Sequence, residues 1–325
     1  MIVFATIIAC ALNGSESLIV FEGPRDWTFQ GKVIVPETQS GPAVLMIGGG
    51  IANDLNWSTP GSLLIGEEPR QVTITGHSHD DATALVNALV SKGCAVMHYS
   101  TVSKDDPKQA LYPYELSLTD PLEIMEIAES AFATFANLPS VEGRSIVLLG
   151  FSMGAQRAVN LAKEHEKVTS IVLLSGAQIT ATSKDDQGGN VHYQASKKME
   201  NPELDVYDYD GDGVIHLWEI SGVLAIQARQ EVGIENLPTK DSSGMPFGEP
   251  VLDLLQKPTL AIYGALDEHQ SCHAVILSDN VISRPWLEVR VIPGVGHQLG
   301  PEKEGKMGPI HSSICKLVAQ WVIDN

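Results

Sequence analysis

The residues best suited to do chemistry form the pentapeptide Gly150-Phe151-Ser152-Met153-Gly154. A serine in G-x-S-x-G spacing is typical of a nucleophile on a sharp turn between a strand and a helix, because the glycines permit a strained backbone. The apolar run Ser145–Leu149 predicts the strand, and the small-residue-rich segment Ala155–Ala162 predicts the helix. The alternative is an ordinary glycine-rich turn with an N-capping serine. We predict that Ser152 is a nucleophile.

A serine nucleophile needs an imidazole to accept its proton and a carboxylate to orient that imidazole. Among the ten histidines, His297 is favoured because it follows the predicted strand Leu287–Ile292 and a glycine-rich loop; weaker competitors are His269, His273 and His311. A second predicted strand, Thr259–Tyr263, runs into a turn that contains two adjacent acids. Asp267 and Glu268 are therefore both candidates for the orienting carboxylate.

The reaction also needs backbone N–H donors where negative charge develops. The first donor is predicted to be the N–H of Met153, the residue after the nucleophile. The loop after the strand Ala43–Gly48 contains three consecutive glycines, which let the main chain approach a substrate closely. We expect Ile51 to supply the second donor, with Gly50 as the alternate; a phosphate-binding loop is less well supported because G-x-G-x-x-G and a Walker lysine are absent.

A second motif, Asp208–Glu219, matches the calcium loop of an EF-hand. The predicted ligands are the side chains of Asp208, Asp210, Asp212 and Glu219 and the carbonyl of Val214. The alternative is a solvated acidic turn before a helix. We expect one structural Ca²⁺ here and no organic cofactor.

Short apolar runs alternate with longer segments of helical period, which predicts a doubly wound α/β fold. The expected strands are Gly31–Val35, Ala43–Gly48, Ala95–Thr101, Ser145–Phe151, Ser170–Leu174, Thr259–Tyr263 and Leu287–Ile292. The expected helices are Ala82–Ser91, Leu122–Ala136, Ala155–His165 and Ile310–Ile323. Residues 17–178 and 251–325 are predicted to form the core, and the polar segment 179–250 is predicted to be an inserted cap with the acidic loop inside it.

Composition excludes several classes of protein. The chain has 325 residues, with 21 Lys+Arg against 40 Asp+Glu and a net charge of −19, so nucleic acid and anionic membranes are poor partners. A hydrophobic fraction of 43% excludes disorder as the dominant state. The apolar run Ile2–Leu12 is too short to cross a membrane. Residues 1–16 have two open interpretations. A shortened export signal implies a secreted, periplasmic or lipid-anchored protein, whereas an N-terminal strand or core segment implies a cytoplasmic one.

Taken together, these segments resemble the α/β-hydrolase superfamily, especially dienelactone-hydrolase-like esterases. The resemblance is carried by residues 48–56, 82–99, 150–154, 264–267 and 294–297. It implies a mostly parallel sheet with a cap between strands 6 and 7, and it favours Asp267 over Glu268 as the acid. The proline and arginine of the family's oxyanion loop are replaced here, so substrate specificity does not transfer.

The predicted function is a serine hydrolase that cleaves a carboxylic ester of a small-molecule acyl substrate through an acyl-enzyme. Alternatives on the same fold are an acyl-CoA thioesterase, an acyltransferase or an amidase. An alternative from another class is a non-catalytic, calcium-dependent binding module. Oligomeric state is not predicted.

Overall fold

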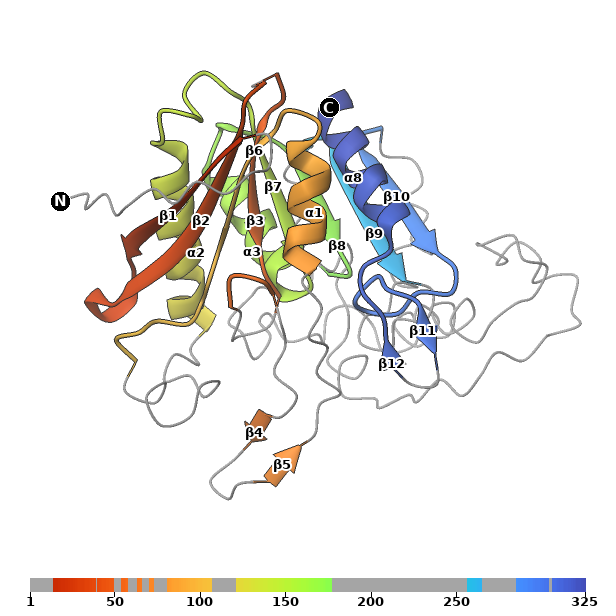
Figure 1. Ribbon diagram of the computed structural model, residues 1–325, viewed down its shortest axis with the longest axis horizontal. Coiled ribbons are helices and arrows are strands. Elements are labelled where there is room, and N and C mark those ends of the chain that lie inside the picture. The colour runs from red at the N-terminus through yellow and green to blue at the C-terminus, as the bar shows by residue number, and fades with distance from the viewer. Residues whose placement is uncertain are drawn as a thin grey trace, which may run out of the picture.

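The main feature of the computed structural model is an eight-stranded sheet in the order β1-β2-β6-β3-β7-β8-β9-β10 (Figure 1). The two N-terminal strands run antiparallel to their neighbours, and all the others are parallel. The structure describes residues 14–38, 40–49, 54–57, 63–65, 70–72, 81–106, 121–176, 256–264, 285–303 and 306–325. The predicted fold class is thus confirmed.

The strands of the main sheet are β1 (Gly14–Glu22), β2 (Thr28–Pro36), β3 (Ala43–Ile47), β6 (Ala95–Tyr99), β7 (Ile146–Phe151), β8 (Val168–Leu174), β9 (Thr259–Gly264) and β10 (Leu287–Ile292). Two short hairpins are formed by β4 (Leu63–Ile65) with β5 (Arg70–Val72), and by β11 (Glu302–Lys303) with β12 (Lys306–Met307). The helices are η1 (Pro24–Asp26), α1 (Asp81–Val90), α2 (Pro121–Ala136), α3 (Met153–Glu164) and α8 (Ser312–Asp324).

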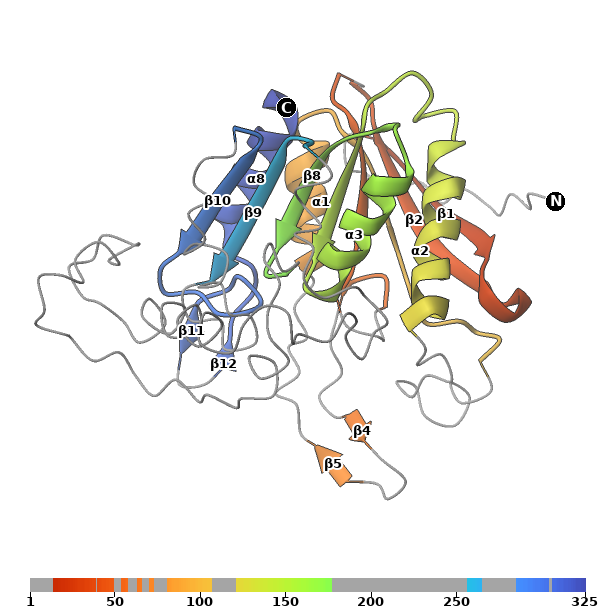
Figure 2. The same ribbon diagram turned by 180° about the vertical axis from the view of Figure 1, so that it is seen from behind.

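Helices cover both faces of the sheet, which explains why its central strands are apolar without strict alternation. Helices α1 and α8 lie on one face, and α2 and α3 lie on the other (Figures 1 and 2). Along β3, Leu45 and Ile47 pack with α2 and α3, while Val44 and Met46 pack with α1 and α8. All four side chains are fully buried. The central strands therefore form a rigid base whose carboxyl ends can carry a site.

The expected elements are present with small shifts at their ends. Helix α3 begins at Met153 rather than Ala155, because the turn at Ser152 leads directly into it. Strand β1 was not predicted with these bounds; it lies at the edge of the described sheet, paired with β2, and its side chains are exposed or partly buried except Phe21, which is buried in the core. It begins at Gly14, so residues 14–16 belong to a strand, while residues 1–13 lie outside the described residues.

Residues 177–255 join β8 to β9, which are the sixth and seventh strands of the main sheet in chain order. The predicted cap falls in this interval and lies outside the described residues.

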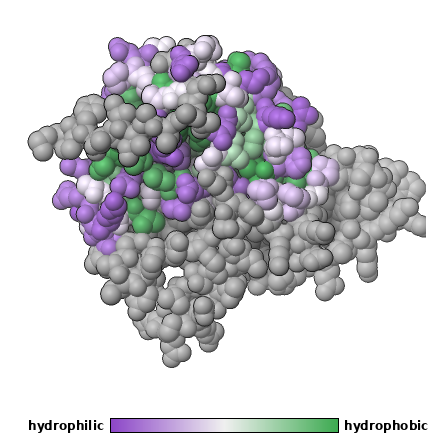
Figure 3. Space-filling view, in the orientation of Figure 1, coloured by the Kyte–Doolittle hydropathy of each residue, from purple (hydrophilic) through white to green (hydrophobic). Residues whose placement is uncertain are grey.

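The surface on the side of α1 and α8 mixes hydrophilic and hydrophobic residues (Figure 3). Among the described residues, no helix is both long and apolar enough to span a membrane. Two free cysteines, Cys94 and Cys315, are buried beneath this face among the residues that pack with α1 and α8.

Candidate active site

Ser152 lies on a strained turn between β7 and α3. Its backbone has φ 51° and ψ −122°, a combination that non-glycine residues rarely adopt. The turn is held by a 2.8 Å hydrogen bond from the Ser152 N–H to the carbonyl of Leu174 at the end of β8. A Cβ on Gly150 would lie 2.5 Å from the Cα of Ala155, so glycine is required there. The sequence prediction of a sharp strand-to-helix turn is therefore confirmed.

His297 faces this serine from the loop after β10. Its Nε2 lies 3.0 Å from Ser152 Oγ, although the two residues are 145 positions apart in the chain. With the ring proton on Nδ1, the serine hydroxyl donates a hydrogen bond to Nε2. The pair has the geometry of a nucleophile and its general base.

The loop that carries His297 is anchored on both sides of the ring. Leu299 is fully buried, and its N–H donates to the Gly296 carbonyl at 2.9 Å. The N–H of His311 donates in turn to the carbonyl of Leu299, also at 2.9 Å. His311 caps α8 and bonds to Ser313, so this competing histidine lies elsewhere.

Three glycines at the carboxyl ends of strands allow the main chain to approach the pair closely. A Cβ on Gly49, after β3, would lie 2.7 Å from the Cβ of Ser152. A Cβ on Gly176, after β8, would lie 2.7 Å from the carbonyl carbon of Ser152. A Cβ on Gly264, the last residue of β9, would lie 2.9 Å from the carbonyl carbon of Gly296. The sequence showed these glycines but not the contacts that require them.

Apolar side chains flank the reactive pair. The ring of Phe151 lies 5.4 Å from the His297 ring, and it also stacks on Trp57 at a centroid distance of 6.2 Å. Met153, on the far side of the nucleophile in the chain, is 45% exposed. The immediate surroundings of Ser152 can therefore contact an apolar substrate group.

A buried arginine lies beside the nucleophile turn. Arg157, on α3, is 7% exposed, and its Nη1 donates to the carbonyl of Gly48 at 3.1 Å. Burial lowers the pKa of this guanidinium, while interaction with Tyr99 acts in the opposite direction. Burial also raises the pKa of the Tyr99 phenol above its ordinary value. Sequence reasoning missed Arg157; a cation between the apolar positions 155, 158 and 161 of a helix was the available signal.

Several predicted site residues lie outside the described residues. These are the acid candidates Asp267 and Glu268, the oxyanion candidates Gly50 and Ile51, the histidines His269 and His273, and the calcium ligands Asp208, Asp210, Asp212, Val214 and Glu219. Within the described ranges, no group of three or more acidic, histidine or cysteine side chains could hold a metal ion. The structure thus brings Ser152 and His297 into contact, and the roles of the residues outside the described ranges stay predictions.

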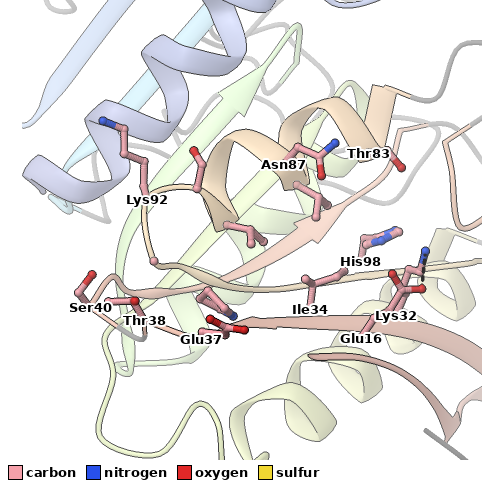
Figure 4. A pocket seen from close by; sticks show the side chains of 15 residues that line it. Glu16, Lys32, Ile34, Glu37, Thr38, Ser40, Thr83, Asn87, Lys92 and His98 are labelled. Atoms are coloured by element: carbon pink, nitrogen blue, oxygen red, sulfur yellow. Dashed lines mark ion pairs between the residues drawn. The ribbon is translucent and has the colours of Figure 1, made fainter. Parts of the chain in front are cut away.

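A separate cavity of about 790 Å³ lies between β2 and α1 (Figure 4). Its wall includes Asn87 of α1, His98 of β6 and an ion pair in which Lys32 Nζ lies 2.9 Å from a Glu16 carboxylate oxygen. Neither Ser152 nor His297 lines it. This cavity is therefore separate from the contact between Ser152 and His297.

Comparison with known proteins gives a consistent picture of the fold. Residues 124–227 match the family model described as BAAT / Acyl-CoA thioester hydrolase C terminal. No curated protein sequence matches the chain.

Solved structures resemble almost the whole chain at low sequence identity. A hypothetical protein from Pseudomonas aeruginosa has a TM-score of 0.53 and 13% identity, covering 98% of this chain and 95% of its own. A dienelactone hydrolase from Anabaena variabilis has a TM-score of 0.51 and 14% identity, covering 96% and 99%. The α/β-hydrolase GrgF from a Penicillium species has a TM-score of 0.51 and 16% identity, covering 94% and 97%. The chain therefore has the α/β-hydrolase fold, with a serine and a histidine paired at the carboxyl ends of its parallel strands.

Proposed function

We propose that the protein is a serine hydrolase that cleaves an acyl ester through a covalent acyl-enzyme. The observation that carries the proposal is the 3.0 Å separation of Ser152 Oγ and His297 Nε2 on a strained strand-to-helix turn. Backbone strain at a single polar residue is typical of functional sites, because the surrounding structure must sustain it.

In the proposed mechanism, Ser152 Oγ attacks the substrate carbonyl while His297 takes the hydroxyl proton. The N–H of Met153 and that of Ile51 or Gly50 donate to the oxyanion that forms. The tetrahedral intermediate collapses, His297 gives its proton to the leaving alcohol, and an ester between Ser152 and the acyl group remains. Water then repeats the sequence and releases the acid.

Asp267 is proposed as the carboxylate that orients His297. Supporting this, Gly264 lies directly against the main chain of Gly296, and Asp267 follows Gly264 by three residues. The strand that leads to Asp267 therefore ends against the loop that carries His297.

Thioester hydrolysis is the second candidate reaction, favoured by the match of residues 124–227 to an acyl-CoA thioester hydrolase model. Both reactions pass through the same acyl-enzyme and differ only in the leaving group. A panel of p-nitrophenyl esters and acyl-CoA thioesters that share the same acyl chains separates them. Acyl transfer is recognised if an added alcohol or amine acceptor gives a new product, and amidase activity if an anilide of the same acyl group is cleaved.

The test of the hydrolase proposal is covalent labelling with a fluorophosphonate. We expect wild type to be labelled at Ser152 and Ser152→Ala not to be labelled. Ser145→Ala is the matched control, because Ser145 is exposed immediately before β7, whereas Ser152 immediately follows it, so this variant should label normally. If folded wild-type protein is not labelled, the hydrolase proposal fails and the non-catalytic binding module takes its place.

We also propose that one Ca²⁺ binds the loop at residues 208–219 and stabilises the cap. This proposal rests on the ligand pattern of the sequence alone.

A further inference from the structure

The loop after β3 is the segment proposed to supply the second oxyanion donor, and the first backbone carbonyl of this loop is held by contacts with α3. That carbonyl belongs to Gly48, and it accepts a 3.1 Å hydrogen bond from Nη1 of Arg157. The same carbonyl faces Gly154, since a Cβ there would lie only 2.5 Å from it. Two residues in the first turns of α3 therefore contact one peptide group of the loop.

The orientation of the Gly48–Gly49 peptide group determines where Gly49 lies. No cis peptide bond occurs in the described residues, so the N–H of Gly49 points opposite to the carbonyl of Gly48. Because that carbonyl points toward α3, the N–H points away from it. Fixing the plane of this one peptide group sets the position of Gly49, whose missing Cβ would lie 2.7 Å from the Cβ of Ser152.

Arg157 is suited to this task by its burial and its chemistry. A guanidinium that is 7% exposed has lost most of its hydration, which is costly unless its donors find acceptors. The planar guanidinium directs its N–H groups along fixed lines, so it constrains an acceptor more than a flexible ammonium does. Its helix also begins at the nucleophile turn, five residues earlier. The contact therefore ties the nucleophile and the loop to one helix.

We infer that Arg157 is a positioning residue that holds the Gly48–Gly49 peptide, where the loop after β3 begins, against Ser152 and so supports the second oxyanion donor proposed for that loop. This inference rests on the proposed hydrolase function. It predicts that removing the guanidinium lowers the rate of the chemical step and leaves substrate binding nearly unchanged, because the oxyanion exists only in the transition state.

The test compares Arg157→Met with Arg144→Met. Arg144 is the matched control because its Nη1 also donates to a glycine carbonyl, that of Gly41 at 3.0 Å, but at the amino-terminal end of β3. Steady-state hydrolysis of a p-nitrophenyl ester gives kcat and KM. The number of active sites is measured by fluorophosphonate stoichiometry, so that kcat is expressed per competent site. A general loss of folding lowers the number of sites, whereas misplacement of the donor lowers the rate at each site.

For Arg157→Met we expect kcat per site to fall by about 10- to 100-fold, since a misplaced donor costs nearly as much as a missing one. KM should stay within about threefold of wild type, as uniform binding is untouched. Arg144→Met should keep kcat per site within about twofold, whatever its effect on thermal stability.

The inference is overturned if folded Arg157→Met retains kcat per site within twofold of wild type, or if Arg144→Met loses as much. Should Arg157→Met fail to fold, Arg157→Lys is judged by the same criterion, since it keeps the charge and loses the planar fork. Wild type that is neither labelled nor active rejects the hydrolase proposal itself, whereas active wild type with an equally active Arg157 variant rejects only the role of Arg157.

Discussion

Replacing Gly264 by alanine tests whether the end of β9 positions His297. The added methyl group would lie 2.9 Å from the carbonyl carbon of Gly296 and closer still to its oxygen. Ordinary contacts of this kind begin at 3.4 Å, so the end of β9 and the backbone next to His297 must move apart by at least 3.4 − 2.9 = 0.5 Å. Such a shift acts directly on the 3.0 Å separation between Nε2 and Ser152 Oγ.

The expected loss follows from the sensitivity of catalysis to geometry. A misplacement of about 1 Å costs roughly 100-fold in rate, so a shift of about half that size or more should lower kcat/KM about 10- to 100-fold. This corresponds to about 1.4 to 2.7 kcal/mol of transition-state stabilisation. Ester hydrolysis and the second-order rate of fluorophosphonate labelling both report it, because each requires the histidine to accept the serine proton.

Gly294→Ala is the control, since it lies in the same loop and has nothing within 4 Å of its missing Cβ. Its φ of 72° makes alanine unfavourable by about 1 kcal/mol of stability, without pushing on a neighbour. Its kcat/KM should stay within about twofold of wild type. The reasoning is refuted if folded Gly264→Ala keeps wild-type rates, or if Gly294→Ala is impaired to the same degree.

Three further predictions concern stability and metal binding. Burial raises the pKa of Cys94 to about 12 and that of Cys315 to about 11, from an ordinary value of 9.0. Both thiols should therefore resist a disulfide reagent at pH 8. The free energy of unfolding in chemical denaturation should fall as pH rises from about 9 to 12, because only the unfolded chain readily loses these protons. A pH-independent unfolding free energy across that range would contradict this. Chelation of the Ca²⁺ proposed at residues 208–219 should lower the midpoint temperature of thermal unfolding, and added Ca²⁺, but not added Mg²⁺, should restore it. An unchanged melting curve would refute the calcium site. Leu299→Ala should cost about 2–5 kcal/mol in denaturant unfolding by opening a cavity beneath His297, so a loss under 1 kcal/mol would show that the buried leucine does not anchor the loop.

Much of the fold could be predicted because the central strands are buried on both faces. Strands β3, β7, β8 and β9 read as short continuous apolar runs, and the helices between them have clear helical periods. Strand β1 was missed although Leu18–Phe21 is a short apolar run and Phe21 is buried. Leu18 and Val20 are exposed because β1 is an edge strand, so an apolar run there does not mark a strand buried on both faces.

That Ser152 and His297 come together could be predicted for a different reason. Ser152 lies in a motif whose spacing is dictated by a strained turn, so its local sequence carries the geometry. His297 was found from its position after a strand and a glycine-rich loop. Arg157 was not found, because its role depends on a carbonyl 109 residues away in the chain. Contacts that exist only in the assembled sheet leave at most a local anomaly, here a cation on an apolar helix face.

The distance in sequence between Ser152 and His297 has a consequence for how activity arises during folding. Ser152 follows β7 and His297 lies in the loop after β10, and β8 and β9 must be in place before the two residues can meet. Such non-local pairings form late, because the entropy of closing a long loop is lost before the favourable contacts are made. The nucleophile is therefore latent in any partly assembled chain that lacks its last strands. Fluorophosphonate labelling during refolding should appear only after the helices have formed. The time at which labelling begins therefore reports when the sheet is complete.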